Sequence, residues 1–238
     1  MPAPRPIETL RVSVVIPAYN EAGNILRVLA PLMQVQEIGE VIVASDGSTD
    51  ETAALARSAG AKTIELPHNA GKTEAALRGA REASYPVILL CDADLVHLTE
   101  RHVREMVRRY CEGWDMVIMD KGAQPWLFMS LLKSVPAISG TRILEKRLLF
   151  EVPFRAGDRF RFENRINDYC FAQGYGIAVS PAQEIHDRRK FVKYPFWRGL
   201  WLDIRGAWEL MAGDGARGIL HNLVVFHRIY KLAQEARR

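Results

Sequence analysis

The sequence has few cysteines, no long hydrophobic run and no strong excess of one charge. Its three cysteines, Cys91, Cys111 and Cys170, are odd in number and far apart, which argues against a disulfide framework or a thiolate metal site. No window reaches the roughly 18 apolar residues of a membrane span. The proline-rich start lacks the apolar stretch of a secretory signal. We therefore expect a cytoplasmic protein, with peripheral contact to the inner membrane face left open.

The two signs of charge nearly balance, because 32 Lys and Arg against 28 Asp and Glu leave a formal charge of +4. A surplus this small does not choose between nucleic acid, anionic lipid and an anionic substrate. The chain lacks a zinc or helix-turn-helix signature and a basic sheet with interleaved aromatics, so we expect no nucleic-acid partner. With 48% hydrophobic and 25% charged residues, the composition is that of a folded globular protein.

What the sequence does contain, in its first hundred residues, is an alternation of short β-branched segments with helical patterns. This alternation predicts an α/β fold, a mainly parallel sheet flanked by helices. The expected strands are 12–16, 40–44, 62–66 and 87–91, and the expected helices are 20–36, 48–59, 72–83 and 100–112. Pro17 should end the first strand, and Pro31 should end or kink the first helix.

The second half of the chain is less regular. We expect strands at 116–119, 177–179 and 183–185, and helices at 141–150 and 162–173. Residues 123–138 are compatible with a helix or a loop. The tail from Trp197 is expected to be mostly helical.

Each of the first four expected strands is followed by a polar or glycine-containing turn. The turns are Tyr19-Asn20-Glu21, Ser45-Asp46-Gly47, Asn69-Ala70-Gly71-Lys72 and Asp92-Ala93-Asp94. The carboxyl ends of parallel strands share one edge of the sheet, where ligands bind. Four polar turns on that edge therefore predict one binding site.

The Asp92-Ala93-Asp94 turn can offer two carboxylates to a hard cation such as Mg²⁺ or Mn²⁺, together with substrate phosphates. Either aspartate could instead cap the next helix, and Asp46 could close an Asx turn. Lys72 could be a solvated lysine in the first turn of a helix. A cation there opposes the helix dipole, and a bound phosphate would compensate it.

Together with Val14-Val15-Ile16-Pro17-Ala18 ahead of the first turn, these four motifs resemble, in order and spacing, the family 2 glycosyltransferases with the GT-A fold. The resemblance covers about residues 10 to 120 and implies a nucleotide-diphosphate-sugar donor with a divalent metal. It implies these site residues: Pro17, Ala18, Tyr19 and Glu21 around the base and ribose, Asp46 on the base, Lys72 near the nucleotide, Asp94 as principal metal ligand, and Asp92 toward the ribose or metal. Many relatives carry Asp-Asp-Gly-Ser where this chain has Ser45-Asp46-Gly47-Ser48, so the identity of the base stays open.

The second half resembles the acceptor side of polyprenyl-phosphate sugar transferases and glucosyl-3-phosphoglycerate synthases, through Ile138-Ser139-Gly140-Thr141-Arg142 and Arg147-Leu148-Leu149. Glu163 is the candidate general base of an inverting transfer, with Asp168 second. A solvated helix acid is the alternative for Glu163, and a retaining enzyme would need no base. By the same resemblance His186 stands where some relatives place a further metal ligand, and a structural histidine is equally open.

Seven basic residues are clustered in the segment 142–165, and they bear on the nature of the acceptor. They suggest an anionic acceptor, such as a phosphorylated small molecule or a lipid phosphate, or else a solvated surface. The seven are Arg142, Lys146, Arg147, Arg155, Arg159, Arg161 and Arg165.

The tail of the chain contains an apolar helical face, which either packs on the catalytic domain or rests on an anionic membrane. It comprises Trp197, Trp201, Ile204, Trp208 and Met211.

The sequence therefore predicts a metal-dependent glycosyltransferase, a hexosyltransferase, whose partners are a nucleotide-sugar donor and an anionic acceptor. A catalytically inactive nucleotide-binding protein of the same fold is the alternative. We expect a flexible N-terminus at 1–10, a nucleotide-sugar-binding half at 11–120, an acceptor-binding half at 121–195 and C-terminal helices at 196–238. The sugar, the base, the stereochemical outcome and the oligomeric state are left open.

Overall fold

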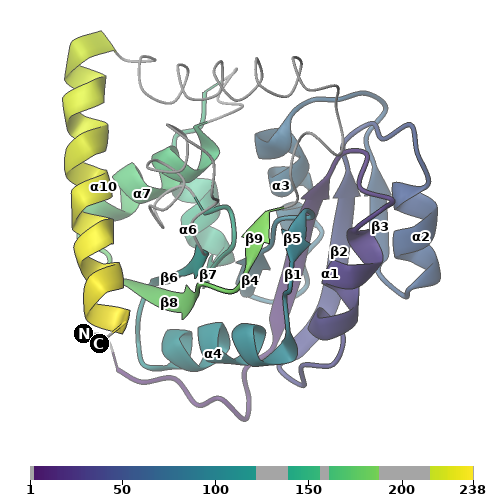
Figure 1. The fold of residues 1–238 in the computed structure, drawn as a ribbon, viewed down its shortest axis with the longest axis horizontal. Helices are drawn as coiled ribbons and strands as arrows, with labels where there is room; N and C mark the ends of the chain where they lie inside the picture. Colours follow the sequence, from purple (N-terminus) through teal and green to yellow (C-terminus); the bar gives the residue numbers. More distant parts are fainter. Residues whose placement is uncertain (1–2, 122–138, 156–160, 188–214, 238) are drawn as a thin grey trace.

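A computed structural model describes residues 3–121, 139–155, 161–187 and 215–237. Its centre is a seven-stranded sheet in the order β3-β2-β1-β4-β7-β6-β8 (Figure 1). The strands are β1 (Val12–Ala18), β2 (Ile38–Ser45), β3 (Lys62–Glu65), β4 (Val87–Leu90), β6 (Met116–Lys121), β7 (Arg142–Glu145) and β8 (Ile177–Ala182). The expectations for 123–138, for Arg159 and for the aromatic face from Trp197 to Met211 lie outside the described residues.

The sheet is mainly parallel, as the sequence predicts. β7 is antiparallel to both of its neighbours, β4 and β6, and every other pairing in this sheet is parallel. The carboxyl ends of all its strands except β7 therefore lie on one edge. A separate two-stranded ribbon, β5 (Leu95–Val96) with β9 (His186–Asp187), stands at that edge.

Helices cover both faces of the sheet (Figure 1). The first face packs against α1 (Ile25–Leu32), α2 (Thr52–Ser58) and α4 (Glu100–Cys111). The second packs against α3 (Lys72–Arg81), α6 (Lys146–Glu151), α7 (Phe162–Gln173) and α10 (Gly215–Arg237). No helix among the described residues is long and apolar enough to cross a membrane.

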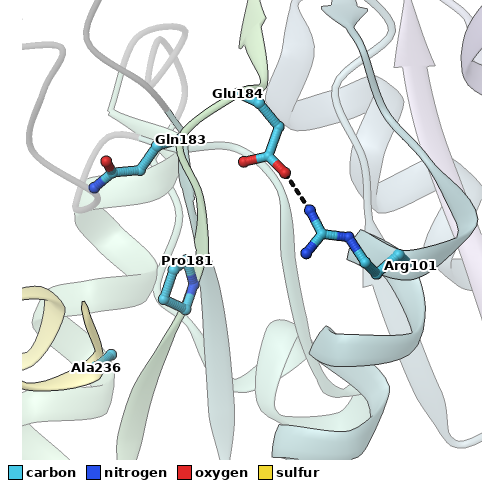
Figure 2. A pocket seen from close by; sticks show the side chains of 5 residues that line it. All are labelled: Arg101, Pro181, Gln183, Glu184 and Ala236. Carbon is cyan, nitrogen blue, oxygen red and sulfur yellow. Dashed lines mark hydrogen bonds and ion pairs between the residues drawn. The ribbon is translucent and has the colours of Figure 1, made fainter. Parts of the chain in front are cut away.

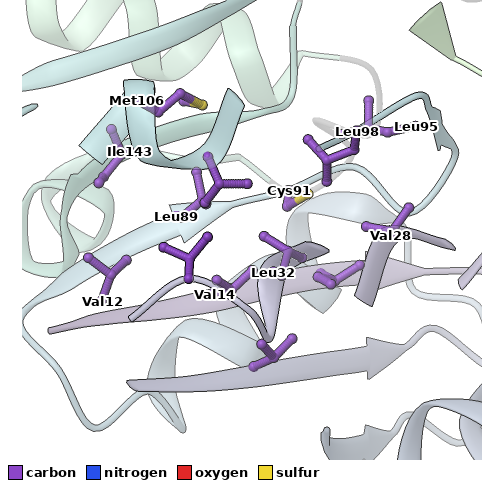
Figure 3. Packing of buried hydrophobic residues seen from close by; sticks show 14 of the residues in the cluster. Val12, Val14, Val28, Leu32, Leu89, Cys91, Leu95, Leu98, Met106 and Ile143 are labelled. Atoms are coloured by element: carbon purple, nitrogen blue, oxygen red, sulfur yellow. The ribbon is translucent and has the colours of Figure 1, made fainter. Parts of the chain in front are cut away.

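Two hydrophobic cores result, because successive side chains of a strand point to opposite faces. Val14 and Leu89 belong to the core beneath α1 and α4, whereas Val15 and Leu90 belong to the other core. Figure 3 shows the first of these cores. Val14 and Leu89 lie close to Leu32 of α1, and Met106 of α4 lies on the other side of Leu89. Burial on both faces explains why these strands read as continuous apolar runs in the sequence.

Pro17 does not end the first strand, contrary to the prediction. β1 continues to Ala18, and Pro17 pairs in register with Ala44 of β2. The Ala18 carbonyl accepts a hydrogen bond on the β2 side, from Asp46 N, and the Val15 carbonyl accepts one on the β4 side, from Cys91 N. The backbone nitrogen of Pro17 points toward β4, like the backbone of Val15. Because the pairing of β1 with β4 ends at Val15, the missing N–H of Pro17 removes no hydrogen bond from the sheet.

The predicted helix over 141–150 is wrong in its first half. Residues Arg142–Glu145 form β7, in the middle of the sheet, and the helix α6 begins only at Lys146. Pairing on both sides with β4 and β6 overrides the local helical pattern, since short apolar runs do not distinguish the two states. The predicted strand at 183–185 is also wrong, because β8 reaches Ala182 and a turn precedes β9.

The first helix is shorter than expected. It begins at Ile25 and ends at Leu32, directly after Pro31, so the early end predicted for this helix is confirmed. The helix expected at 162–173 has those bounds in α7, ending at Gly174 in the left-handed conformation (φ 75°).

Candidate active site

A chain of ion pairs crosses the carboxyl edge of the sheet and joins five side chains. Lys72 Nζ lies 2.6 Å from Glu163 Oε1 and 2.6 Å from Asp92 Oδ1. Lys121 Nζ lies 3.0 Å from Asp92 Oδ2 and 2.6 Å from Asp187 Oδ1. The structure thus brings together Lys72, Asp92 and Glu163, three of the predicted site residues.

Asp92 is the centre of this chain. Burial alone would raise the pKa of its carboxyl group, but the charges of Lys121 and Lys72 and their hydrogen bonds hold that pKa well below its usual range. Thr141 Oγ1 also donates to Asp92 Oδ2, at 3.3 Å. In turn, Asp92 and Glu163 raise the pKa of Lys72 above its usual value against the effect of burial. The carboxylate and both ammonium groups are therefore charged at neutral pH.

Asp94 is in a different electrostatic setting. Burial and the charges of Asp187, Asp92 and Glu21 raise the pKa of Asp94 to about 7, and Lys121 opposes this only in part. A carboxyl group surrounded by other carboxylates becomes easier to ionise when a cation joins it.

This donor set fits a hard divalent cation. Such cations take oxygen ligands, and Mg²⁺ commonly uses one or two carboxylates plus substrate phosphates. Among the described residues, no group of three or more His, Cys, Asp or Glu side chains could hold a metal ion by itself. Water molecules and substrate phosphates commonly complete the coordination of such a cation.

Asp46 holds the loop that presents Lys72. The backbone N–H groups of Ala70 and Gly71 donate to its two carboxylate oxygens, at 2.7 and 2.9 Å. Gly71 has φ 96°, a conformation that favours glycine, and α3 begins at the next residue. Asp46 thus connects the end of β2 to the start of α3.

The turns after β1 and β2 are joined by hydrogen bonds. Asn20, with φ 53°, accepts a bond from the Thr49 N–H at 2.8 Å through its side-chain oxygen. The Glu21 N–H donates to Thr52 Oγ1 at 2.7 Å. The Glu21 side chain is buried, and Tyr19 is half-buried. The structure therefore places Pro17, Ala18, Tyr19 and Glu21 on the same edge as Asp46.

Glu163 is not a solvated helix acid. It lies in the first turn of α7, its side chain is 13% exposed, and it makes the 2.6 Å ion pair with Lys72. Asp168, the second candidate base, lies later in α7.

Arg142 does not belong to a basic surface, contrary to the sequence interpretation. It is fully buried, and its Nη1 donates to Asn167 Oδ1 at 3.0 Å and to the Glu163 carbonyl at 3.4 Å. Its other terminal nitrogen donates to the Ser139 carbonyl. Arg142 therefore supports α7 and the turn before β7 from inside the fold. Lys146 and Arg147 also have local partners, the Ala83 carbonyl and Glu145.

Gly140 is a point of close approach to the ion pairs. A Cβ at this position would lie 2.1 Å from Asp92 Oδ1 and 2.2 Å from Lys72 Nζ. Real contacts are never this short, so a side chain here would push the two charged groups apart.

We expect Gly140→Ala to weaken binding at this edge and to destabilise the protein by about 1–3 kcal/mol, as for other overpacked sites. Thermal unfolding and nucleotide binding measure the two effects. Gly60→Ala is the control, because Gly60 has φ 90° but no atom within 4 Å of an added Cβ. That variant should lose stability and keep binding. Normal nucleotide binding by Gly140→Ala would contradict the geometry.

His186 lies in β9, opposite Val96 of β5, and its ring is 5.2 Å from that of His97. His97 has φ 66°, an uncommon conformation for a residue with a side chain. The ribbon thus carries His186 and Asp187 to the edge where Asp94 lies. Lys121 and Asp187 are site residues that sequence reasoning missed. The available signal was their position: Lys121 lies two residues after the strand predicted at 116–119, and Asp187 follows His186.

One pocket lies away from this chain of ion pairs. It has a volume of about 400 Å³ and is lined by Arg101, Pro181, Gln183, Glu184 and Ala236 (Figure 2). Arg101 forms an ion pair with Glu184, drawn as a dashed line in Figure 2, and His102 Nε2 lies 2.6 Å from the same carboxylate. The pocket contains none of the predicted site residues.

The fold and the site together define an α/β protein of the GT-A type, with its polar site at the carboxyl edge of the sheet. Residues 13–167 match the family model for glycosyl transferase family 2. The chain belongs to this family.

Individual relatives are more distant. The chain is 36% identical over 104 residues to 4,4'-diaponeurosporenoate glycosyltransferase of Staphylococcus aureus (strain MRSA252), a match that covers 42% of this chain and only 28% of that protein. Two solved structures of glucosyl-3-phosphoglycerate synthase from Mycobacterium tuberculosis share the fold. The complex with Mn²⁺, uridine diphosphate (UDP) and glucosyl-3-phosphoglycerate has a TM-score of 0.67 at 23% identity, over 92% of this chain and 80% of that one. The complex with Mg²⁺ and UDP has a TM-score of 0.68 at 24% identity, with the same coverage.

Proposed function

We propose that this protein transfers a sugar from a nucleoside-diphosphate sugar to the hydroxyl group of an acceptor, with Mg²⁺ or Mn²⁺ as cofactor. The observation that carries the proposal is the chain of ion pairs from Glu163 through Lys72, Asp92 and Lys121 to Asp187, beside the high-pKa carboxyl group of Asp94. It lies on the edge where parallel α/β sheets bind their ligands, in a chain of glycosyl transferase family 2.

The donor would occupy the edge above β1, β2 and β4. The base and ribose would be surrounded by Pro17, Ala18, Tyr19 and Glu21. Asp46 would bind the base and would also hold the loop before Lys72 through its two backbone hydrogen bonds. UDP is the first nucleotide to try, since both structural neighbours were solved in complex with it.

Asp94 would hold the cation, with His186 as a further ligand. Asp92 would act mainly through its two lysines, because both of its oxygens are engaged by ammonium groups. A bound divalent cation supplies a Lewis acid that stabilises the charge developing on the diphosphate leaving group. Lys72 would add fixed positive charge near that group.

Glu163 would remove the proton from the acceptor hydroxyl in an inverting reaction. Two contacts support this role. Lys72 fixes the direction of its carboxylate, and the buried Arg142 donates to its backbone carbonyl. A general base needs such a defined position as much as a suitable pKa.

An acceptor with its own negative charge fits the charged segment around the start of α7. Arg161 precedes this helix and lies two residues before Glu163. The two structural neighbours are named for a reaction on phosphoglycerate, and the S. aureus relative for a carotenoid acid. Both of these compounds, phosphoglycerate and the carotenoid acid, are anionic.

We therefore expect the double variant Arg159→Ala, Arg161→Ala to raise the KM for an anionic acceptor and to leave donor binding nearly unchanged. The effect should shrink as salt rises, because salt screens the attraction between the protein's positive charge and an anionic acceptor. Steady-state kinetics at two salt concentrations measure it. Arg147→Ala, in the same segment but paired with Glu145, is the matched control and should behave as wild type. Equal use of a neutral acceptor by wild type and the double variant would contradict an anionic acceptor.

The function is tested by screening UDP-, GDP- and dTDP-sugars for stabilisation of the protein with and without Mn²⁺. A ligand at 100 times its Kd stabilises by about 2.7 kcal/mol, which is readily seen in thermal unfolding. The proposal predicts stabilisation by one class of donor that depends on the cation. Binding without any hydrolysis or transfer of the sugar would favour the alternative, an inactive nucleotide-binding protein.

A further inference from the structure

Lys121 is a buried lysine that joins two carboxylates from distant parts of the chain. It ends β6, its side chain is 11% exposed, and its ammonium group contacts Asp92 at 3.0 Å and Asp187 at 2.6 Å. Burial would lower the pKa of Lys121, but Asp187, Asp92 and Asp94 raise it above the usual value. The group is therefore a permanent positive charge among these three acids.

The ion pair with Asp187 connects the small ribbon to the main sheet. β5 and β9 are two residues each, paired as Leu95 with Asp187 and Val96 with His186. So short a pair of strands cannot fix its own position, because isolated ribbons are marginal even when longer. Lys121 lies in the central sheet, so its bond to Asp187 places β9 relative to the turn that carries Asp94.

Lys121 also balances the charge beside Asp94. Its ammonium group contacts Asp92, two residues before Asp94, and Asp187, which lies opposite Leu95, the residue after Asp94. Without Lys121, Asp92 would keep Lys72 as a partner. Asp187, which lies opposite the residue after Asp94, would lose this cation, and carboxylates that lie close together repel each other.

We propose that Lys121 is a positioning residue that sets the affinity of this edge for a divalent cation bound together with a nucleoside diphosphate. It does so by holding Asp187 through their 2.6 Å ion pair, which keeps β9 beside the turn that carries Asp94. The proposal rests on the proposed function. The two lysines that contact Asp92 therefore have different roles. Lys72 connects this carboxylate to Glu163, and Lys121 connects it to Asp187 of β9.

The experiment measures UDP binding by calorimetry as Mn²⁺ is varied, in wild type, Lys121→Met, Asp187→Asn, the double variant and Lys121→Arg. Loss of a residue that orients a metal ligand commonly costs about 10- to 100-fold in metal affinity. We expect each single variant to need at least about 10-fold more Mn²⁺ for half-maximal UDP binding. The double variant should be no worse than the weaker-binding single variant, because both remove the same ion pair. Lys121→Arg should recover part of the loss, and UDP binding in EDTA should be nearly unchanged.

Lys62→Met is the matched control, since Lys62 pairs with Glu82 at 2.9 Å on the surface, and it should bind as wild type. Wild-type Mn²⁺ dependence in Lys121→Met, or single effects that multiply in the double variant, would overturn the proposal. If Lys121→Met does not fold, Asp187→Asn and Lys121→Arg decide the same question.

A second measurement separates this proposal from the proposed function. If wild-type protein does not bind UDP with Mn²⁺, the proposed function fails, and amide hydrogen exchange without ligands still tests the positioning role. Peptides containing residues 94–97 and 184–187 should exchange at least about 10-fold faster in Lys121→Met than in wild type, because the ribbon opens more easily. Unchanged protection of these peptides would overturn the positioning role.

Discussion

Asp94→Ala should abolish sugar transfer and the metal-dependent part of nucleotide binding while the protein stays folded. A bound cation contributes several kcal/mol to the stabilisation of a developing charge, and each 1.36 kcal/mol is a factor of ten in rate. We therefore expect turnover to fall by about 10³-fold or more. Turnover at saturating Mn²⁺ measures the effect. Wild-type turnover in the variant would show that Asp94 does not hold the metal.

The raised pKa of Asp94 allows a control experiment without metal, which tests whether Asp94 is needed for folding. Because this pKa is about 7 in the folded state, against 3.8 ordinarily, the contribution of Asp94 to stability is present at low pH and is lost as pH rises toward 7. At pH 8 the ionised carboxylate disfavours the metal-free fold, so Asp94→Asn should unfold at the same or a higher temperature than wild type. For the same reason, wild-type Mn²⁺–UDP binding should weaken as pH falls below about 7, and Asp94→Asn should lack this dependence. A large loss of stability in Asp94→Asn would show that the residue is structural.

Glu163→Gln should lower turnover by about 10²-fold or more with little change in donor affinity, as expected for loss of a general base. The amide keeps the size of the side chain and can still contact Lys72, so the fold should be preserved. Turnover and UDP affinity are measured on the same preparation.

Two variants show whether this effect is specific. Asp168→Asn removes the second candidate base from the same helix, and Glu151→Gln removes an exposed acid that accepts from Tyr169 on α7. Both should keep near wild-type turnover. A product with retained configuration, or full activity in Glu163→Gln, would contradict the role of this residue.

Much of the first half of the fold can be predicted from the sequence, because β1 and β4 are buried on both faces and read as continuous apolar runs. The turns that follow them contain the polar residues of the site, so the amino-acid pattern alone locates the ligand-binding edge. Asp92, Lys72 and Glu163 are far apart in the sequence, but the rule that parallel strands share one such edge already places the first two together.

Other features depend on tertiary contacts that local sequence does not encode. Arg142 looks like one basic residue among seven, yet β7 inserts between β4 and β6 and buries it beneath Glu163. Lys121 and Asp187 have no motif of their own, and they meet because β9 pairs with β5 at the edge where β6 ends. The sequence predicts that Pro17 ends its strand, because it does not reveal that the pairing of β1 with β4 has already ended on the side to which Pro17 points.

Metal-dependent sugar transfer at this edge is tested most directly by nucleotide release. Wild-type protein is incubated with UDP-, GDP- or dTDP-sugars, Mn²⁺ and a phosphorylated acceptor, and the nucleoside diphosphate and the new glycoside are followed by NMR. We expect release from one class of donor that stops in EDTA and in Asp94→Ala. No release from any donor, or release that persists without the metal and without Asp94, would contradict metal-dependent transfer at this site.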